Sequence, residues 1–474
     1  MRVRLALAQA VLLLAQPLGA EPAAGTRPAR QRPNVVLLVA DQWRAQALGF
    51  AGDVNARTPH LDRLAEHGTV LTSAVSTCPV CSPYRASLMT GRYPLRHGVF
   101  VNDVPLNTEA VSLAQAFSAA GYRTAFIGKW HIDGRGRSSY VPPERRQGFE
   151  FWRGCECTHE YNRSPYYADT SEKKYWPGYD AQAQTEEAVG YIRAHQGEPF
   201  LLVLAWGPPH NPYQTAPERY RRLFRPEEIV LRPNVPPEAA AGARRDLAGY
   251  YAHCAALDDC VGRIVGALEE TGLADDTILV FTSDHGDMLG SHAQERKQRP
   301  WDESVLVPFL VFWPGGLGRT GRKLTAGFGT PDIMPTLLGL AGVAVPATVD
   351  GEDRSAWLRG RQPDDERPAL ICCITPFSEW ARTRGGREYR GVRTSRYTYV
   401  RTLDGPWLLY DNREDPYQQR NLVGRAEHAA MQAILERALQ RELGRMKDEF
   451  LPGRVYLDKW GYRTDASGAV PYDP

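Results

Sequence analysis

The chain has 474 residues, with 57 Lys and Arg, 55 Asp and Glu, and a hydrophobic content of 43%. This length suits one large domain with a smaller one, or about three ordinary domains, and the apolar content excludes a disordered chain. The nearly balanced charge argues against a protein that binds nucleic acid through a broad basic field.

The first twenty residues have the pattern of a secretory signal peptide. Arg2 and Arg4 give a charged start, an apolar run covers Leu5 to Ala15, and small residues lead up to Ala20. That run is well short of the roughly 20 residues that a membrane-spanning helix needs, and no later segment is long enough. We therefore expect an exported protein, periplasmic or secreted, without stable membrane insertion. Residues 21–32 are polar and contain proline, which predicts a flexible linker.

Short apolar runs bounded by turn residues then recur along the chain. Because they are continuous rather than alternating, they are typical of strands buried on both faces of a mainly parallel sheet. Stretches with helical periodicity lie between them, which predicts a doubly wound α/β domain over residues 33–366 with helices flanking the sheet. The expected strands are Val35–Ala40, Thr124–Ile127, Phe200–Trp206, Thr277–Thr282 and Phe309–Trp313, and the expected helices are Ser112–Ala120, Gln184–Ala194 and Arg244–Glu270.

A smaller C-terminal α+β domain is predicted over residues 367–474. Tyr, Val and Thr are frequent in Arg390–Arg401, which indicates antiparallel strands. A helix is expected from about Ala426 to Glu449. The tail after Leu451 is rich in Pro, Gly and Tyr and has no clear periodicity, so no element is predicted there.

Side chains suited to catalysis follow four of the expected strands. The carboxyl ends of the strands in an open parallel sheet form the ligand crevice, so residues placed there meet at one edge. Any one of them alone is explained by turn formation or by a structural histidine, whereas all four together indicate a site. The groups are Asp41-Gln42, Lys129 to His131, His210, and Asp284-His285.

Two of these groups predict a divalent metal site. Asp41, Gln42, Asp284 and His285 offer two carboxylates, one amide carbonyl and one imidazole. A donor set made mostly of oxygen suits Ca²⁺, with Mn²⁺ as the alternative. A dedicated zinc site draws more often on Cys and His.

A short helix with an anion-binding start is predicted around the second cysteine of the chain. Ser82 as N-cap and Pro83 at the first helical position indicate its start, and Gly91 indicates its end. Cys81 then lies at the positive end of the helix, with Arg85 one turn further along the same face. A nucleophile in this place beside an arginine suits the transfer of a sulfuryl or phosphoryl group.

Other cysteine patterns have weaker interpretations. Cys78 and Cys81 have the spacing of a redox pair or half a zinc site, but neither the expected βαβ setting nor a second such pair is present. The region from Arg135 to Asn162 is poor in regular structure, and long loops on such a scaffold often shape the substrate pocket. Arg135 and His159 are therefore candidates for substrate contact, with plain loop structure as the equal alternative. A metal site built on Cys155-x-Cys157-x-His159 is the weakest alternative, because closely spaced ligands without a second cluster are a poor zinc pattern.

The pattern Cys81-x-Pro83-x-Arg85, continuing to Gly91-Arg92, resembles the modification sequence of the type I, formylglycine-dependent sulfatases of the alkaline phosphatase superfamily. The resemblance covers residues 33 to about 425 and keeps the family's order of motifs. The further matches are Asn34–Asp41, Gly128–His131, Pro209-His210, Thr282–Gly286, Lys297 ahead of Trp301–Ser304, Val307–Phe309, Arg390–Arg393, and Leu409–Asp411 with Asp415-Pro416.

The resemblance implies a sulfuric ester hydrolase with an alkaline phosphatase-like fold. Cys81 would be oxidised to formylglycine (3-oxoalanine) by a formylglycine-generating enzyme before the protein finishes folding. The aldehyde would hydrate, and one hydroxyl, activated by the metal, would attack sulfur and displace the alcohol. The other hydroxyl would lose its proton and expel sulfate, so that no water has to attack sulfur.

The resemblance also implies roles for individual residues. The metal would be held by Asp41, Gln42, Asp284, His285 and the modified Cys81. Arg85 would stabilise the hydrate, and His131 would take the proton during elimination. Lys129 and Lys297 would bind sulfate oxygens, and His210 would protonate the leaving alcohol because the imidazole pKa lies near neutrality. Lys297 is assigned by its spacing, and the nearby alternatives are Arg296 and Arg299.

Two positions depart from the commonest family pattern. Many members have Asp where Gln42 stands and Asn where His285 stands, and the version found here also occurs among phosphonate monoester and phosphodiester hydrolases. Such a hydrolase is therefore the alternative to a sulfatase. A sulfated poly- or oligosaccharide is the expected substrate, because export and abundant Trp, Tyr and Arg suit a polar polymer outside the cell. A catalytically silent glycan-binding protein is disfavoured, because every expected site group is present.

Overall fold

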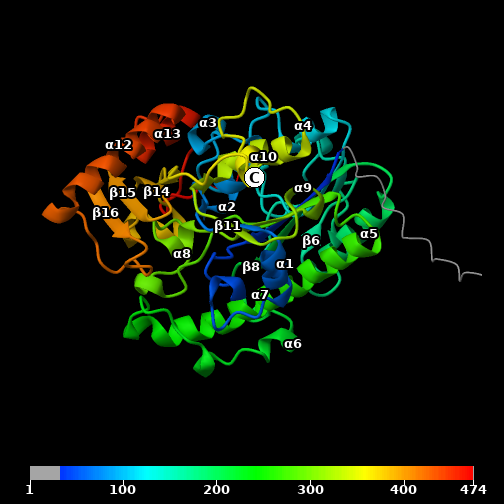
Figure 1. The fold of residues 1–474 in the computed structure, drawn as a ribbon, viewed down its shortest axis with the longest axis horizontal. Coiled ribbons are helices and arrows are strands. Elements are labelled where there is room, and N and C mark those ends of the chain that lie inside the picture. Colours follow the sequence, from blue (N-terminus) through cyan, green and yellow to red (C-terminus); the bar gives the residue numbers. More distant parts are fainter. Residues whose placement is uncertain (1–31, 473–474) are drawn as a thin grey trace, which may run out of the picture. The chain divides into compact units, whose positions relative to one another are not determined.

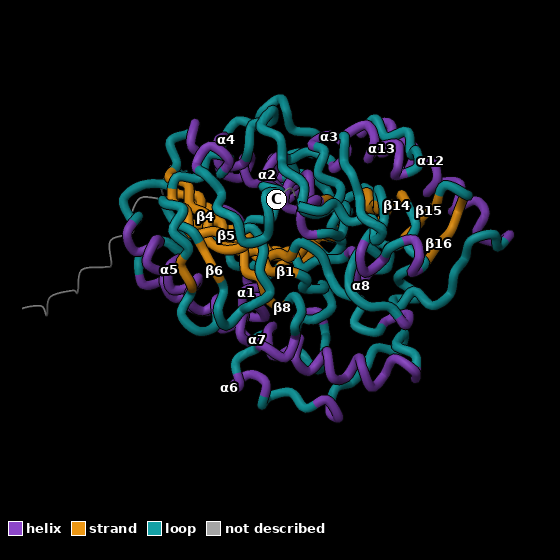
Figure 2. Tube along the Cα trace, turned by 180° about the vertical axis from the view of Figure 1, so that it is seen from behind, coloured by secondary structure: helices purple, strands orange, loops and turns teal. Residues whose placement is uncertain are grey.

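The computed structural model describes residues 32–472, so the expected signal peptide and nearly all of the expected linker lie outside the described residues. Within residues 32–472, eight strands form one mixed sheet that is mainly parallel, as the sequence predicts (Figure 2). Their order is β11 (Arg322–Leu324), β2 (Thr69–Leu71), β10 (Phe309–Phe312), β9 (Thr277–Ser283), β1 (Asn34–Asp41), β8 (Phe200–Pro209), β4 (Arg123–Lys129) and β5 (Phe151–Cys155). Strands β9, β1, β8, β4 and β5 run parallel, whereas β10 pairs with β9 in the antiparallel direction.

The central strand β1 is buried along its whole length because both faces of the sheet are covered by helices. Val35, Leu37 and Val39 belong to one hydrophobic cluster, whereas Val36 and Leu38 belong to another. This alternation assigns successive side chains to opposite faces and explains why the strand reads as a continuous apolar run. The first face is covered by α2 (Cys81–Thr90), α4 (Leu113–Ala119) and α10 (Ile333–Ala341), and the second by α1 (Pro59–His67), α5 (Asp180–Ala194) and α7 (Ala240–Glu270) (Figure 1).

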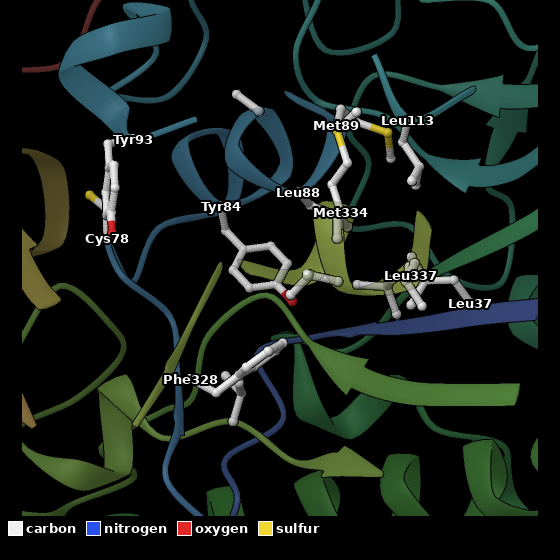
Figure 3. Packing of buried hydrophobic residues seen from close by; sticks show 14 of the residues in the cluster. Leu37, Cys78, Tyr84, Leu88, Met89, Tyr93, Leu113, Phe328, Met334 and Leu337 are labelled. Carbon is white, nitrogen blue, oxygen red and sulfur yellow. The ribbon is translucent and has the colours of Figure 1, made fainter. Parts of the chain in front are cut away.

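Helix α2 is held between the sheet and α10 by its apolar side chains. Figure 3 shows Tyr84, Leu88 and Met89 pointing into a cluster that includes Met334 and Leu337 of α10. The helix ends at Gly91, whose φ of 63° is left-handed, as predicted. This packing fixes the position of the helix start.

The predicted N-cap of α2 is wrong by two residues. The carbonyl of Val80 accepts the first helical hydrogen bond from the Tyr84 amide, so Val80 is the N-cap and Cys81 is the first helical residue. The free amide of Ser82 is satisfied by the side chain of Asn102 at 3.0 Å, and Pro83 has no amide to satisfy. Cys81 nevertheless lies at the positive end of the helix, as expected.

The smaller C-terminal part carries an antiparallel sheet and helices, as predicted. Its strands are β13 (Ala369–Cys373), β14 (Tyr389–Arg393), β15 (Tyr397–Thr402) and β16 (Gly405–Asp411), and its long helix is α12 (Ala429–Met446). A further helix, α13 (Gly453–Trp460), lies in the tail where no element was expected. Its buried face consists mainly of Tyr456 and Leu457, which is too small an apolar pattern to stand out.

Short elements connect the longer ones. They are α3 (Pro94–His97), α6 (Glu218–Arg221), α8 (Asp302–Val305), α9 (Pro314–Leu317), α11 (Ser355–Leu358), β3 (Ala74–Val75), β6 (Pro165–Tyr166), β7 (Lys174–Tyr175) and β12 (Phe328–Gly329). Among the described helices, none is both long and apolar enough to cross a lipid bilayer.

Candidate active site

Four neighbouring parallel strands, β9, β1, β8 and β4, bring their carboxyl ends to one edge of the sheet, where the start of α2 also lies. A cavity of about 230 Å³ opens beside this edge. The side chains predicted from the four strands converge here, and six of the predicted site residues line the cavity. These are Cys81, Lys129, His131, His159, His210 and Lys297.

The Cys81 sulfur lies at the bottom of the cavity among charged groups. Its Sγ is 3.2 Å from His285 Nε2 and 3.9 Å from the Asp41 carboxylate. The ammonium groups of Lys297 and Lys129 lie 3.5 and 3.7 Å from the sulfur. Burial and Asp41 oppose ionisation, but the neighbouring cations outweigh them and hold the pKa of the Cys81 thiol well below its usual value. This position stabilises a negatively charged group.

Two carboxylates and an imidazole form the oxygen-rich wall beside Cys81. His285 Nε2 is 3.7 Å from Asp41 and 3.5 Å from Asp284. His285 Nδ1 donates to the carbonyl of Gly286 at 3.0 Å, which leaves Nε2 facing the carboxylates. Burial and the negative charge of Asp41 raise the pKa of Asp284. Together with Cys81, these side chains offer ligand atoms that lie within 4.8 Å of one another, which is close enough to hold one metal ion.

The Gln42 side chain has a fixed orientation at the same wall. Its Nε2 donates to Asp287 at 2.6 Å, which leaves Oε1 facing Lys297 Nζ at 3.2 Å. The backbone of Gln42 has a left-handed φ of 72°, and its amide donates to Asp284 at 3.0 Å. The amide oxygen therefore points toward the site rather than away from it. Asp287, which orients Gln42, was visible in the sequence only as part of the turn after Asp284.

Arg85 and Lys129 neutralise the two carboxylates. Arg85 lies 3.3 Å from Asp41 and 3.0 Å from Asp284 through one nitrogen, and its other terminal nitrogen donates to the Lys129 carbonyl at 2.6 Å. Lys129 Nζ is 2.5 Å from Asp41. All of these charged groups are buried, so their interactions are only weakly screened by water.

His131 is held by an aspartate that was not predicted. Its Nε2 is 2.8 Å from Asp103 Oδ1, while its buried Nδ1 makes no hydrogen bond with a described residue. Burial alone would lower the pKa of His131, but Cys157 and Asp103 raise it above its usual value. The ring therefore has a high proton affinity. Asp103 lies in an irregular segment between apolar residues, where no periodic signal marks it.

His210 forms a pair with Lys297. Lys297 Nζ is 2.7 Å from His210 Nε2, and His210 Nδ1 lies 2.9 Å from the Asn211 carbonyl, to which it donates. Burial and the charge of Lys297 hold the pKa of His210 well below its usual value, so the neutral ring accepts a hydrogen bond from Lys297. His159 stacks on His210 with ring centres 4.4 Å apart.

The three basic residues of the 296–299 loop contact different groups. Lys297 contacts both Cys81 and His210. Arg299 donates to the carbonyl of Lys297 at 2.6 Å and lies over the ring of Trp380. Arg296 lines the cavity and packs against Tyr213. Of the three, Lys297 is therefore the one placed at the sulfur.

Of the two candidates for substrate contact, His159 lines the cavity and Arg135 does not. Arg135 is 59% exposed and lies 4.0 Å from Asp133. Its neighbour Arg137 does line the cavity and lies 3.4 Å from Asp103. Cys157 also lines the cavity and lies 3.8 Å from His159 Nε2.

Comparison with known proteins places these features in a family context. The Sulfatase family profile matches residues 33–343, and the profile for the C-terminal region of N-sulphoglucosamine sulphohydrolase matches residues 290–445. An ulvan-active sulfatase of Formosa agariphila is 44% identical over 450 residues, covering 93% of this chain and 87% of the relative. An endo-4-O-sulfatase of Bacteroides thetaiotaomicron is 30% identical over 503 residues, covering 93% of this chain and 96% of the relative. The crystal structure of yidJ from Bacteroides fragilis superposes with a TM-score of 0.81 at 28% identity, covering 90% of this chain and 99% of that one.

Proposed function

The chain belongs to the sulfatase family of sulfuric ester hydrolases, and from that premise we propose that it removes sulfate from a sulfated poly- or oligosaccharide outside the cytoplasm. The observation that carries the proposal is the placement of Cys81 within 4 Å of two ammonium groups, a carboxylate and an imidazole. Relatives named as ulvan-active and endo-4-O-sulfatases support a carbohydrate substrate. The signal peptide expected in residues 1–20 supports export.

We propose that Cys81 is converted to formylglycine by a formylglycine-generating enzyme. The hydrated aldehyde would supply an oxygen nucleophile in place of the thiol. The Cys81-x-Pro83-x-Arg85 pattern supports this conversion. The Cys81 side chain is only 1% exposed, so the maturing enzyme has to reach it before the chain folds.

The residues beside Cys81 fit a divalent cation. Asp41, Gln42, Asp284 and His285 would hold it, most simply as Ca²⁺, with Mn²⁺ as the alternative. Two observations support the fit: His285 Nε2 faces the two carboxylates, and the amide oxygen of Gln42 faces the same side. A bound cation would stabilise negative charge on the oxygen nucleophile at position 81.

The surrounding cations would bind the sulfuryl group and stabilise the charge that develops during transfer. Lys129 and Lys297 approach position 81 from two sides, and Arg85 lies behind it against Asp41. Preorganised positive charge in a buried site is more effective than the same charge in water. We assign these three residues to sulfate binding and charge stabilisation.

The proton for the leaving alcohol would come from the Lys297–His210 pair. His210 is the expected donor, and because its lowered pKa leaves the ring neutral at rest near pH 7, we propose that the proton reaches the alcohol with the help of Lys297. Lys297 Nζ holds a proton 2.7 Å from His210 Nε2, so the pair can deliver one to the alcohol oxygen. His131 would accept the proton released at position 81 in the form whose Nδ1 carries no proton, and its raised pKa favours the protonated product.

The decisive experiment combines the Cys81→Ala variant with a substrate panel. Sulfate release from defined sulfated oligosaccharides should fall by at least about a thousandfold, because the nucleophile is lost. The melting temperature should change little. Cys254→Ala, which truncates a buried cysteine in α7 away from the cavity, is the matched control and should keep its activity.

Two results would contradict the proposal. Active protein whose position 81 is wholly a thiol by peptide mass spectrometry would exclude formylglycine as the nucleophile. An aryl phosphonate ester hydrolysed faster than the matching aryl sulfate would instead favour the phosphonate hydrolase suggested by Gln42 and His285.

A further inference from the structure

The described end of the chain returns to the cavity after α13. Ala469 is one of the cavity-lining residues. The tail is anchored by Tyr462, whose hydroxyl donates to the Gly98 carbonyl at 3.1 Å, and by a turn in which Asp465 accepts from the amides of Ser467 and Ala469 at 2.8 and 3.1 Å. The Ser378 amide donates to the Ser467 carbonyl at 2.9 Å. The tail is therefore a fixed wall of the cavity.

The last described residue, Tyr472, contacts the aspartate that holds His131. Its hydroxyl donates to Asp103 Oδ1 at 2.5 Å and accepts from Arg137 Nε at 2.6 Å. Arg137 also donates to the other oxygen of Asp103 at 3.4 Å. Burial opposes ionisation of Asp103, but His131, Tyr472 and Arg137 outweigh it and hold the pKa of this carboxyl well below its usual value. Asp103 is thus a carboxylate with three donors.

Neither Asp103 nor His131 is oriented by a regular element. Asp103 has a left-handed φ of 67° in a segment without helix or strand, and His131 has a φ of 59° just after β4. Side chains on such backbones depend on their hydrogen-bond partners for orientation. The tail supplies one of those partners from a distant part of the sequence.

We propose that Tyr472 is a positioning residue for catalysis, which acts through Asp103 to hold His131 with Nδ1 facing position 81. This inference rests on the proposed function. In the neutral ring, whose Nε2 proton faces Asp103, His131 Nδ1 accepts the proton of the remaining hydroxyl at position 81. The electron pair of that O–H bond forms the carbonyl bond, and the bond from carbon to the sulfate oxygen breaks with its electrons on sulfate. The step therefore releases sulfate and follows departure of the alcohol.

Because sulfate release follows departure of the alcohol, a defect in His131 should affect kcat and kcat/KM differently. The ratio kcat/KM reports steps up to the first irreversible one, here the loss of the alcohol, whereas kcat also contains sulfate release. A variant that misplaces His131 should therefore lower kcat and KM together and leave kcat/KM almost unchanged. General damage to the fold or to substrate binding would lower kcat/KM.

The test is steady-state kinetics of Tyr472→Phe with an activated aryl sulfate, for which loss of the alcohol is fast. Removing one hydrogen bond to the charged Asp103 should lower kcat by about three- to thirtyfold, with a matching fall in KM. Tyr462→Phe is the matched control, because it removes a tail hydroxyl whose one hydrogen bond to a described residue is with the Gly98 carbonyl, and it should leave both constants unchanged. Asp103→Asn should give the same signature as Tyr472→Phe with a larger effect.

Two outcomes would overturn the inference. One is a fall in kcat/KM that parallels kcat, and the other is an unchanged kcat in Tyr472→Phe.

A chain truncated after Ala469 retains the Asp465 turn and removes Tyr472, so it should show the same joint fall of kcat and KM as Tyr472→Phe. These outcomes are distinguishable from failure of the proposed function, which would show as an active Cys81→Ala variant, as active protein with an unmodified thiol at position 81, or as faster hydrolysis of a phosphonate ester.

Discussion

Two nearby cysteines, Cys155 at the end of β5 and Cys157 just after it, differ in the pKa of their thiols. Burial opposes ionisation of both, and at Cys155 it combines with the charge of Cys157 to raise the pKa to about 12. At Cys157 the charges of Lys129 and His131 outweigh burial and lower the pKa to about 5. Cys157 is therefore a thiolate at neutral pH inside the catalytic cavity, and Cys155 is an inert thiol.

Alkylation should distinguish these two cysteines. In the Cys81→Ala background, iodoacetamide at pH 6.5 should label Cys157 and leave Cys155 unlabelled, as measured by peptide mass spectrometry. Because the pKa of Cys157 is lowered, labelling should stay constant as the pH falls from 8 to about 6 and decline only near pH 5. Inorganic sulfate should slow the reaction. Labelling with a midpoint near pH 9 would show that Lys129 and His131 do not lower the pKa of Cys157.

The site residues that directly follow the strands could be predicted from the sequence. The residues that hold those side chains in place through hydrogen bonds could not. Asp41, Lys129, His210 and Asp284 could be predicted to meet, because strand order and direction alone bring their backbones to one edge. Asp103 and Tyr472 could not be predicted, because their positions depend on how irregular segments pack after the sheet has formed. The lowered pKa of His210 likewise depends on the distance to Lys297, which no sequence spacing reveals.

At the scale of elements, a glycine sets how closely β4 approaches β8. Gly128 has a φ of 107°, and a Cβ built on it would lie 2.0 Å from the carbonyl oxygen of Ala205. Only glycine adopts this conformation and leaves this space. The residue directly precedes Lys129, so the close approach also directs the ammonium group toward Asp41.

Gly128→Ala should therefore reduce both stability and activity. We expect the free energy of unfolding to fall by about 2–3 kcal/mol, because the strands must separate and the backbone is strained. Desulfation should fall as Lys129 shifts. Gly266→Ala is the matched control in α7, where no atom lies within 4 Å of the added Cβ, and it should raise stability by about 0.5–1 kcal/mol. Equal unfolding midpoints for both variants would contradict this account.

The central strands were predictable because their apolar runs are continuous and bounded by turn residues. The start of α2 was misplaced because Asn102, which is distant in sequence, satisfies an amide that a local cap would otherwise serve. Helix α13 was missed because it buries few residues, although Pro452 before it and Gly461 after it, with a left-handed φ of 70°, are recognisable boundaries.

At the scale of the whole molecule, a buried ion pair joins the antiparallel sheet to the catalytic region. Arg393 of β14 donates twice to Asp302 of α8, at 3.1 Å in each case, and both side chains are almost fully buried. Gln418 donates to the same carboxylate at 3.1 Å. Helix α8 begins five residues after Lys297, so this pair also supports the loop that carries the cavity lysine.

Arg393→Ala should destabilise the molecule because it leaves the Asp302 carboxylate buried without its charged partner. The expected loss in free energy of unfolding is about 3–5 kcal/mol, measured by chemical denaturation. Arg454→Ala removes an exposed pair with Asp458 and is the control that should leave the midpoint unchanged. If Arg393→Ala unfolds at the wild-type midpoint, the pair does not join the two regions energetically.

The burial of position 81 also has a consequence for how active molecules arise during synthesis. Helix α2 packs against its neighbours through Tyr84, Leu88 and Met89 (Figure 3), and the Cys81 side chain is enclosed in the folded protein. If Cys81 is oxidised as proposed, that oxidation would compete in time with collapse of the nascent polypeptide. Molecules that collapse first would then be trapped with sulfur in place of oxygen, and the specific activity of a preparation would measure the outcome of that competition.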